Sequence, residues 1–120
     1  MFARIVSLDL KPNTHKQFSE LFDKQILPAL RKQQGFKDEI LLVDPGAPRV
    51  VAISTWDTKE NADAYAAKTY PEAVKSLAEV LSGSPAVQTY QVAFSTFYKL
   101  AIGVAANQSP ITNPIPGVGG

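Results

Sequence analysis

Cysteine is absent from this chain of 120 residues. Its absence excludes disulfides, thiolate nucleophiles, iron–sulfur clusters and zinc fingers, and it is typical of cytoplasmic proteins, so we expect a cytoplasmic location. Histidine is nearly absent too, since His15 is the only one. Because a histidine-based metal site needs several converging ligands, the sequence predicts no metal site.

An excess of charge is also missing. The formal net charge is +1, and Lys and Arg are interspersed with Asp and Glu, so no strong field attracts nucleic acid or an anionic membrane. No apolar run approaches the roughly 20 residues of a membrane span, and the first residues lack the basic segment and apolar stretch of a signal peptide. Neither G-x-G-x-x-G nor G-x-x-x-x-G-K-[ST] occurs, so no phosphate-binding loop is predicted. We therefore expect neither nucleic acid nor a membrane as a partner.

Alternating residues open the chain. Residues 2–10 have a period of two, which predicts a strand with Val6 and Leu8 on its more buried face. Apolar residues at helical spacing follow, Phe22 among them, and predict a helix. Pro28 lies inside this pattern, and because it lacks a backbone N–H it should kink the helix or split it in two.

A hairpin and a second broken helix come next. Residues 40–43 and 50–56 are typical of strands, and the turn between them, rich in Pro and Gly, makes them an antiparallel hairpin. The continuous apolar start of the second strand indicates burial on both faces and hence a central position. A helix begins near Asp57 and is interrupted at Tyr70, where the following Pro71 suits a first helical position.

The last predicted strand covers residues 87–100. Globular strands usually have roughly 3–10 residues, so this one is long. Its alternation places Tyr90, Phe94 and Tyr98 on one face. Such an aromatic stripe is more often core or interface than a cofactor site, although contact with a ligand stays open.

This order of elements predicts an α+β, ferredoxin-like fold, βαββαβ, with four antiparallel strands and broken helices on one face. The other sheet face also carries large apolar side chains, and an exposed patch of that kind usually means a partner. We therefore expect a homodimer whose sheets face each other, with Tyr90, Phe94 and Tyr98 at the dimer interface. The predicted domain spans residues 1–100, and an uncharged tail rich in Pro and Gly spans 101–120.

Several short motifs resemble the antibiotic biosynthesis monooxygenase-like family of dimeric α+β barrels. They are Lys11-Pro12 before the first helix, ILPALR at 26–31 running into Gly35-Phe36, and the tryptophan-ended strand 51–56 followed by DTKE at 57–60. The resemblance spans about residues 2 to 100 and implies the fold more firmly than an activity, because related barrels include oxygenases, isomerases and haem-degrading enzymes.

The haem-degrading branch of these barrels is the sharpest test of that resemblance. Its asparagine, tryptophan and histidine positions look like Val6, Tyr65 and Lys75 here, and all three depart from the pattern. Without that histidine the axial haem ligand is missing. We therefore expect no haem and no other cofactor.

The candidate site residues are mostly aromatic. We expect a ligand pocket under the broken helices, lined by Phe22, Trp56, Tyr65 and Tyr70, although a residue in the position of Trp56 is more often a core or hinge aromatic that packs a helix onto the sheet. Tyr65 and Tyr70 flank a helix break, and phenols can orient a ligand or donate a proton. These two and His15 are the weak catalytic candidates; a histidine in a first helical turn is more often simply solvated.

Three functions stay open. The resemblance implies a cofactor-independent monooxygenase that oxidises a small aromatic compound with O₂. The shortage of histidine and cysteine makes a non-catalytic small hydrophobic ligand-binding or stress-related homodimer equally competitive. A pure assembly module is the third, and a cavity above roughly 300 Å³ between helices and sheet would argue against it.

Overall fold

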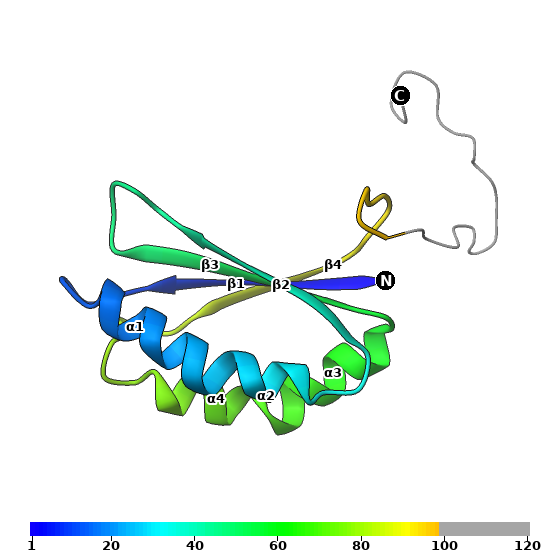
Figure 1. The fold of residues 1–120 in the computed structure, drawn as a ribbon, viewed down its shortest axis with the longest axis horizontal. Coiled ribbons are helices and arrows are strands. Elements are labelled where there is room, and N and C mark those ends of the chain that lie inside the picture. The colour runs from blue at the N-terminus through cyan, green and yellow to red at the C-terminus, as the bar shows by residue number, and fades with distance from the viewer. Residues whose placement is uncertain (99–120) are drawn as a thin grey trace, which may run out of the picture.

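Four strands and two helical arms make up residues 1–98, the part of the chain that this computed structural model describes (Figure 1). The elements in order are β1 (Phe2–Asp9), α1 (His15–Leu21), the π-helix η1 (Phe22–Ile26), α2 (Leu27–Arg31), β2 (Phe36–Val43), β3 (Arg49–Trp56), α3 (Lys59–Lys68), α4 (Tyr70–Ser76) and β4 (Ala86–Gln91).

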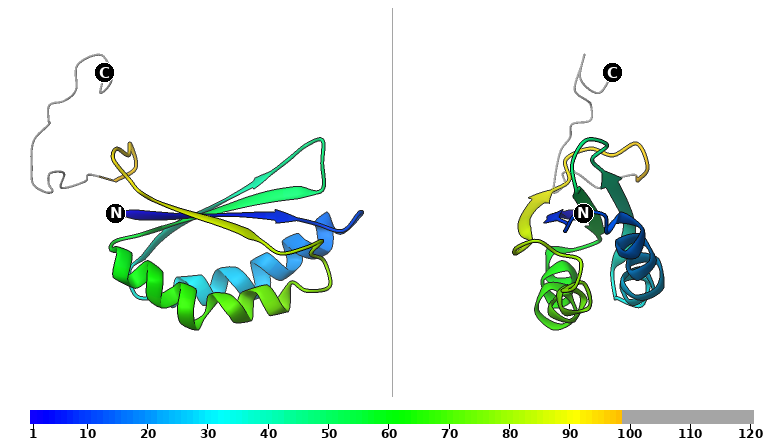
Figure 2. Two further views of the ribbon diagram at one scale, coloured as in Figure 1. Left: turned by 180° about the vertical axis from the view of Figure 1, so that it is seen from behind. Right: turned by 90° about the vertical axis from the view of Figure 1, so that its left-hand side faces the viewer.

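The strands form one antiparallel sheet in the order β2-β3-β1-β4. Both helical arms lie side by side against the same face of this sheet, and the other face carries none (Figures 1 and 2). The ferredoxin-like fold is therefore confirmed, as is the central position of β3. Strand β2 starts earlier than predicted, at Phe36, because the polar residues before Ile40 also pair with β3.

The first arm runs through α1, η1 and α2 without a gap. The predicted interruption takes the form of a π-helical turn just before Pro28, in which the Leu27 N–H donates to the Phe22 carbonyl oxygen. In an α-helix the Pro28 ring would collide with the carbonyl four residues earlier. The wider π turn relieves that collision, so the arm accommodates proline and still presents Phe22 and Ile26 to the interior.

The second arm is broken at Thr69, as predicted, with Pro71 in the first turn of α4. Thr58 caps the start of α3, since its hydroxyl oxygen accepts from the Asn61 N–H at 3.1 Å. The corner before it is tight: the Asp57 N–H donates to the Gly35 carbonyl oxygen at 2.9 Å.

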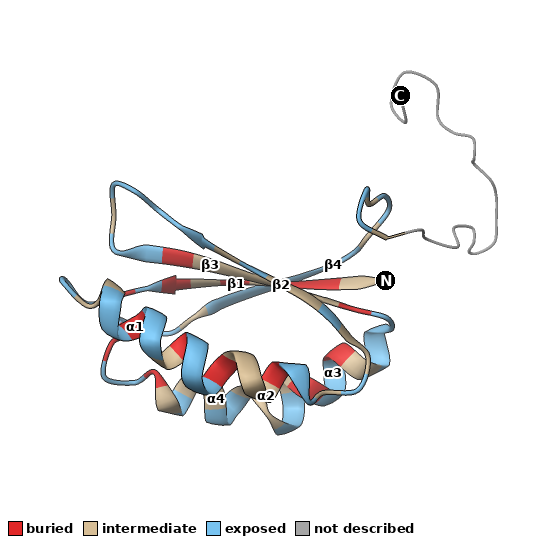
Figure 3. Ribbon diagram, in the orientation of Figure 1, coloured by how far each residue is buried: buried red, intermediate tan, exposed pale blue. Residues whose placement is uncertain are grey.

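The core lies between the sheet and the arms (Figure 3). Val6 and Leu8 of β1 are buried there, as predicted, and Phe18 faces them from α1. Trp56, at the end of β3, is fully buried. Alternation along each strand thus directs one set of side chains toward the helices and the other set away from them.

The sheet face away from the helices is apolar and largely open. Directly paired residues of antiparallel strands share a face, so the pairs Ile5↔Ile53 and Ile40↔Ile53 place all three isoleucines on it. Exposed fractions reach 49% for Leu42 and 52% for Tyr90. We call this surface, made of Ile5, Ile40, Leu42, Val51, Ile53 and Tyr90, the outer face.

The last strand is shorter than predicted. It ends at Gln91, which pairs with Phe2, and one further bond joins the Val92 N–H to the Met1 carbonyl oxygen. Among the described residues after Val92 none continues the strand, and the chain leaves the sheet. The prediction that Phe94 and Tyr98 continue a strand face with Tyr90 is therefore wrong; the residues from 99 to 120, including the expected tail, lie outside the described part.

Within residues 1–98, no helix combines the length and apolar character needed to cross a membrane.

Candidate functional site

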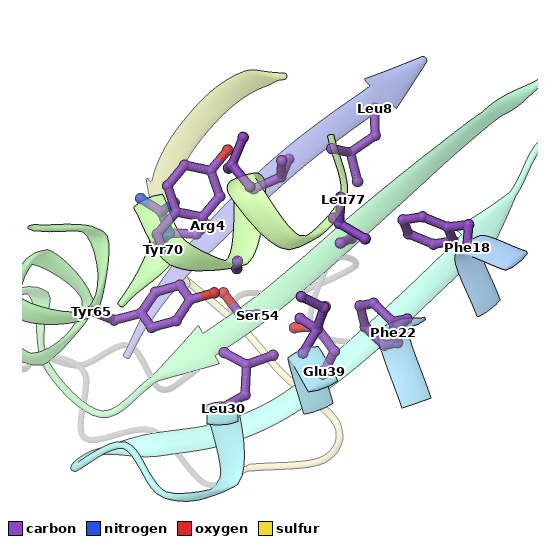
Figure 4. A pocket seen from close by; sticks show the side chains of 15 residues that line it. Arg4, Leu8, Phe18, Phe22, Leu30, Glu39, Ser54, Tyr65, Tyr70 and Leu77 are labelled. Carbon is purple, nitrogen blue, oxygen red and sulfur yellow. The ribbon is translucent and has the colours of Figure 1, made fainter. Parts of the chain in front are cut away.

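A cavity of about 50 Å³ lies between the helix-facing side of the sheet and the two arms (Figure 4). Most of its wall is apolar, and the first arm contributes only apolar side chains: Phe18, Phe22, Ile26 and Leu30. The close-up shows Leu8 and Phe18 toward one end and Arg4, Tyr65 and Tyr70 toward the other. The cavity therefore has an apolar end and a polar, aromatic end.

A second hollow, a groove of about 190 Å³, lies between the two arms. Gln25 and Ala29 line it from the first arm, and Thr69 and Glu72 line it from the second. It shares Ile26, Tyr65 and Ala73 with the inner cavity. These shared residues separate the groove from the inner cavity.

One polar row crosses the sheet at the polar end of the cavity. The pairs Glu39↔Ser54, Arg4↔Ser54 and Arg4↔Thr89 align these four residues across all four strands on the helix-facing side. Arg4, Glu39 and Ser54 line the cavity. A row of polar side chains inside an otherwise apolar wall is costly unless it has partners.

A β-bulge directs Glu39 inward. The register of β2 against β3 shifts between Phe36↔Trp56 and Asp38↔Thr55, so Lys37 is the extra residue. An extra residue reverses which side chains face the core. Glu39 therefore points into the cavity, and Ile40 points to the outer face.

Arg4 is buried and incompletely paired. Its exposed fraction is 6%, and its Nε and Nη2 atoms have no hydrogen-bond partner. Its guanidinium carbon lies 4.7 Å from the ring centroid of Tyr70 and 5.6 Å from that of Tyr65. The two rings stabilise the positive charge through cation–π contacts, but they leave the N–H donors free.

Glu39 is the matching acidic group. Burial, and next the charge of neighbouring Asp38, raise the pKa of Glu39 to about 8, with Arg4 acting in the opposite direction. Its Oε1 has no hydrogen-bond partner, and among the described residues neither Glu39 nor Arg4 takes part in an ion pair. A carboxyl group with such a pKa exchanges its proton near neutral pH, as a general acid or base must.

The tyrosines remain neutral at physiological pH. Burial raises the pKa of Tyr65 to about 12, and burial also raises the pKa of Tyr70. Tyr65 stacks between Trp56, at 5.1 Å between ring centroids, and Tyr70, at 6.2 Å. The tyrosines can therefore hold a ring and offer hydroxyl groups, while Trp56 fixes Tyr65 from behind.

The residues proposed from sequence fall into two groups. Phe22, Tyr65 and Tyr70 line the cavity together. Trp56 does not line it but packs behind Tyr65, and His15 lines neither hollow. Glu39 was missed because the strand was expected to start at Ile40, after the bulge. The only signal in the sequence was a charged residue next to an apolar strand.

Metal-binding chemistry has no support in the described residues, since nowhere among them do three or more His, Asp or Glu side chains gather as a metal site would need. Neither hollow reaches the roughly 300 Å³ typical of ligand pockets, the inner one measuring about 50 Å³. A ligand that contacts Arg4 and Glu39 in the inner cavity therefore needs the two arms to separate.

No protein-family model and no curated protein sequence matches the chain. Solved structures do. A protein from Nitrosomonas europaea provisionally described as an antibiotic biosynthesis monooxygenase is 19% identical, with a TM-score of 0.66 over 78% of this chain and all of the other (100%). The ActVA-Orf6 monooxygenase of Streptomyces coelicolor, in complex with the ligand nanaomycin D, is 17% identical, with a TM-score of 0.67 over 82% of this chain and 92% of that one.

A third match is a point mutant of MhuD, solved with two manganese protoporphyrin IX molecules per active site. It is 18% identical, with a TM-score of 0.64 over 80% of this chain and 98% of the other. At these identities the similarity establishes the fold. The chain has the ferredoxin-like fold of the antibiotic biosynthesis monooxygenase structures, the fold that its sequence motifs implied.

Proposed function

We propose that this domain binds a small phenolic aromatic compound between sheet and helical arms and oxidises it with O₂ without a cofactor. The observation that carries the proposal is Glu39 in the cavity wall, with a pKa of about 8 and no hydrogen-bond partner on Oε1. Glu39 is the general base. Tyr65 and Tyr70 orient the ring, and the apolar first arm keeps water away from it.

The substrate itself supplies the electrons. A phenol with a hydrogen at the para carbon reacts with O₂ to give the para-quinone and water. One oxygen atom of O₂ becomes the new carbonyl and the other becomes water, and the four electrons that reduce O₂ come from the ring. Glu39 accepts the phenolic proton at the start and returns it to the leaving water. No redox group on the protein is needed.

One neighbour in fold supports this proposal, and a second provides a contrast. The ActVA-Orf6 monooxygenase is in complex with the ligand nanaomycin D, and the MhuD mutant has two manganese protoporphyrin IX molecules bound per active site. The cavity here favours the first kind of ligand. No histidine, cysteine or methionine lines it, and these are the commonest axial ligands of haem.

The size of the two hollows limits the ligand. A dry cavity of about 150 Å³ can bind benzene, so the groove of about 190 Å³ has room for a single ring. Reaching Arg4 and Glu39 requires the arms to part around Ile26, Tyr65 and Ala73. The helix break at Thr69 is the natural hinge, because the neighbouring α4 buries none of its residues fully.

Oxygen consumption by the purified protein tests the proposal. The panel contains one- and two-ring electron-rich phenols with a free para position, and no cofactor is added. We expect uptake of one O₂ per quinone formed, and a fall of at least about 100-fold for Glu39→Gln. The exposed Glu60→Gln is the matched control and should leave uptake unchanged. No uptake from any phenol that binds, or equal rates for Glu39→Gln and wild type, would contradict it.

A non-catalytic binder is the second candidate. It is favoured by Arg4, whose free N–H donors need only a ligand and no reaction. In that case phenols raise the melting temperature of the protein and O₂ is not consumed.

We propose further that the domain is a cytoplasmic homodimer whose outer faces pack against each other. The exposed Leu42 and Tyr90 support this, because monomers rarely expose a contiguous apolar surface of this kind. Tyr90, Phe94 and Tyr98 stay proposed interface residues. Sedimentation should find a dimer for wild type and a monomer for Leu42→Glu, while Lys68→Glu on the exposed side of α3 stays dimeric. A monomeric wild type at high concentration would refute the dimer.

A further inference from the structure

The free donors of Arg4 are the strongest unexplained feature of the cavity. A guanidinium that is 6% exposed normally has its N–H groups paired, yet Nε and Nη2 have no partner. Ser54 does not pair with them: its hydroxyl oxygen accepts from the Trp56 indole N–H at 2.9 Å and receives no bond from these two atoms. Glu39 is not ion-paired with it among the described residues.

The aromatic contacts fix the direction of Arg4. Tyr70 and Tyr65 lie against its guanidinium, at 4.7 and 5.6 Å from their ring centroids. The Tyr65 ring is itself held by Trp56 at 5.1 Å. Arg4 is thus a preorganised cation in the wall of an apolar cavity, and such a cation attracts an anionic oxygen strongly because little water screens it.

We propose that Arg4 is an oxyanion site and that the ligand class is an acidic phenol, bound as the phenolate with its oxygen on Arg4 Nε and Nη2. The inference rests on the proposed function in one respect, that the cavity takes an aromatic ligand. It adds the ionisation state of the ligand and the residue that selects it. Arg4 becomes a specificity-determining residue rather than a packing residue.

Charge and protons balance in this arrangement. The phenolic O–H bond breaks, the electron pair stays on the phenolic oxygen facing Arg4, and the proton passes to the carboxylate of Glu39 when that group is ionised. The site holds one positive and one negative charge before and after transfer. The titratable groups around Glu39 are Arg4 from β1, Asp38 from β2, and Tyr65 and Tyr70 from the second arm; the first arm contributes none to the cavity wall.

Binding of 4-nitrophenol to the full chain tests the inference, because its phenolate absorbs visible light and its neutral form does not. The titration is done at a pH about one unit below the pKa of free nitrophenol, where roughly a tenth of it is ionised. We expect the bound compound to be mostly phenolate with wild type and with Arg4→Lys. With Arg4→Met the phenolate band should stay at the level of the free compound, and the affinity should be at least about 10-fold lower.

A second measurement needs no variant and covers the case in which Arg4→Met does not fold. Benzoate, which carries an anionic oxygen, should displace nitrophenolate from wild type, and its neutral analogue benzamide should not. Displacement by both alike, a bound nitrophenol that is neutral, a phenolate band above that of the free compound in Arg4→Met, or no binding at saturation would each overturn the inference.

The outcome separates this inference from the proposed oxidation. Nitrophenol is electron-poor and carries a nitro group in place of the para hydrogen, so it cannot undergo the proposed oxidation and its ionisation is measured without turnover. A phenolate band without oxygen uptake from any phenol leaves the oxyanion site standing and refutes the oxidation. Oxygen uptake from phenols together with neutral bound nitrophenol would support the oxidation and refute the oxyanion site.

Discussion

The indole N–H of Trp56 donates a hydrogen bond to the hydroxyl oxygen of Ser54 at 2.9 Å, inside the core. This bond joins the fully buried end of β3 to the polar row that crosses the sheet. It also explains why a tryptophan that does not line the cavity matters to it, because Trp56 supports both Ser54 and Tyr65.

Ser54→Ala should therefore lower the free energy of unfolding by about 1–3 kcal/mol, because it leaves the buried indole N–H without an acceptor. Urea unfolding measures this. In the background of Trp56→Phe, which has no N–H to satisfy, the same substitution should have almost no effect. Equal losses in both backgrounds would show that the bond is not what Ser54 contributes.

Glu39→Gln should change how stability depends on pH. The folded-state pKa of Glu39 is raised from 4.5 to about 8, so below about pH 4.5 the carboxyl is protonated in both states and contributes no difference. As pH rises toward 8 the unfolded state releases the proton while the folded state retains it, and stability falls.

Glutamine cannot ionise, so the Glu39→Gln variant does not lose stability as the pH rises toward 8. Above about pH 8 it should be more stable than wild type by about 2–4 kcal/mol, a range reduced because part of the Glu39 side chain faces solvent. At low pH the two should coincide. Melting curves across this range check the prediction, and a constant offset at all pH values would contradict it.

Arg4→Met should raise the free energy of unfolding by about 1–3 kcal/mol, because an unpaired buried charge is removed and only cation–π contacts are lost. Arg49→Met is the contrast. Arg49 pairs with Asp9 at 2.8 Å, but its side chain is 55% exposed, so its loss should leave the free energy of unfolding almost unchanged. A loss above about 2 kcal/mol for Arg4→Met would make Arg4 a structural residue.

Gly35→Ala should be more destabilising than Gly83→Ala, although both glycines have positive φ, of 82° and 91°. At Gly35 a Cβ would collide with the side chains of Asp57 and Asn61, whereas at Gly83 it would meet open space. We expect about 1–2 kcal/mol for Gly83→Ala, from backbone conformation alone, and more for Gly35→Ala. Chemical denaturation measures the loss of stability in both variants. Equal losses would mean that the backbone corner before α3 shifts readily to make room for the Cβ at position 35.

Much of the fold could be predicted because apolar periodicity encodes it. The alternation in β1 places Val6 and Leu8 toward the helices, Pro28 marks the π-helical turn of the first arm, and Pro71 marks the break of the second. The last strand could not be predicted in the same way. Its alternation continues past Gln91, but a strand also needs a partner, and β1 ends there.

The candidate site was only partly predictable. Phe22, Tyr65 and Tyr70 were accessible from their helical positions. Glu39 was not, since the bulge at Lys37 is a property of the pairing between β2 and β3 and leaves no clear mark in the sequence. Whether the N–H donors of Arg4 find partners depends on the side chains that three other elements place around it. No local sequence pattern indicates that arrangement.

A crystal structure of the protein with bound 4-nitrophenol tests the account most directly. We predict a ring between the sheet and the two arms, with the phenolic oxygen within hydrogen-bonding distance of Arg4 Nε or Nη2 and a Glu39 carboxyl oxygen beside it. An empty cavity at saturating ligand, or a ring bound only on the outer face, would contradict the claim that Arg4 and Glu39 form a ligand site.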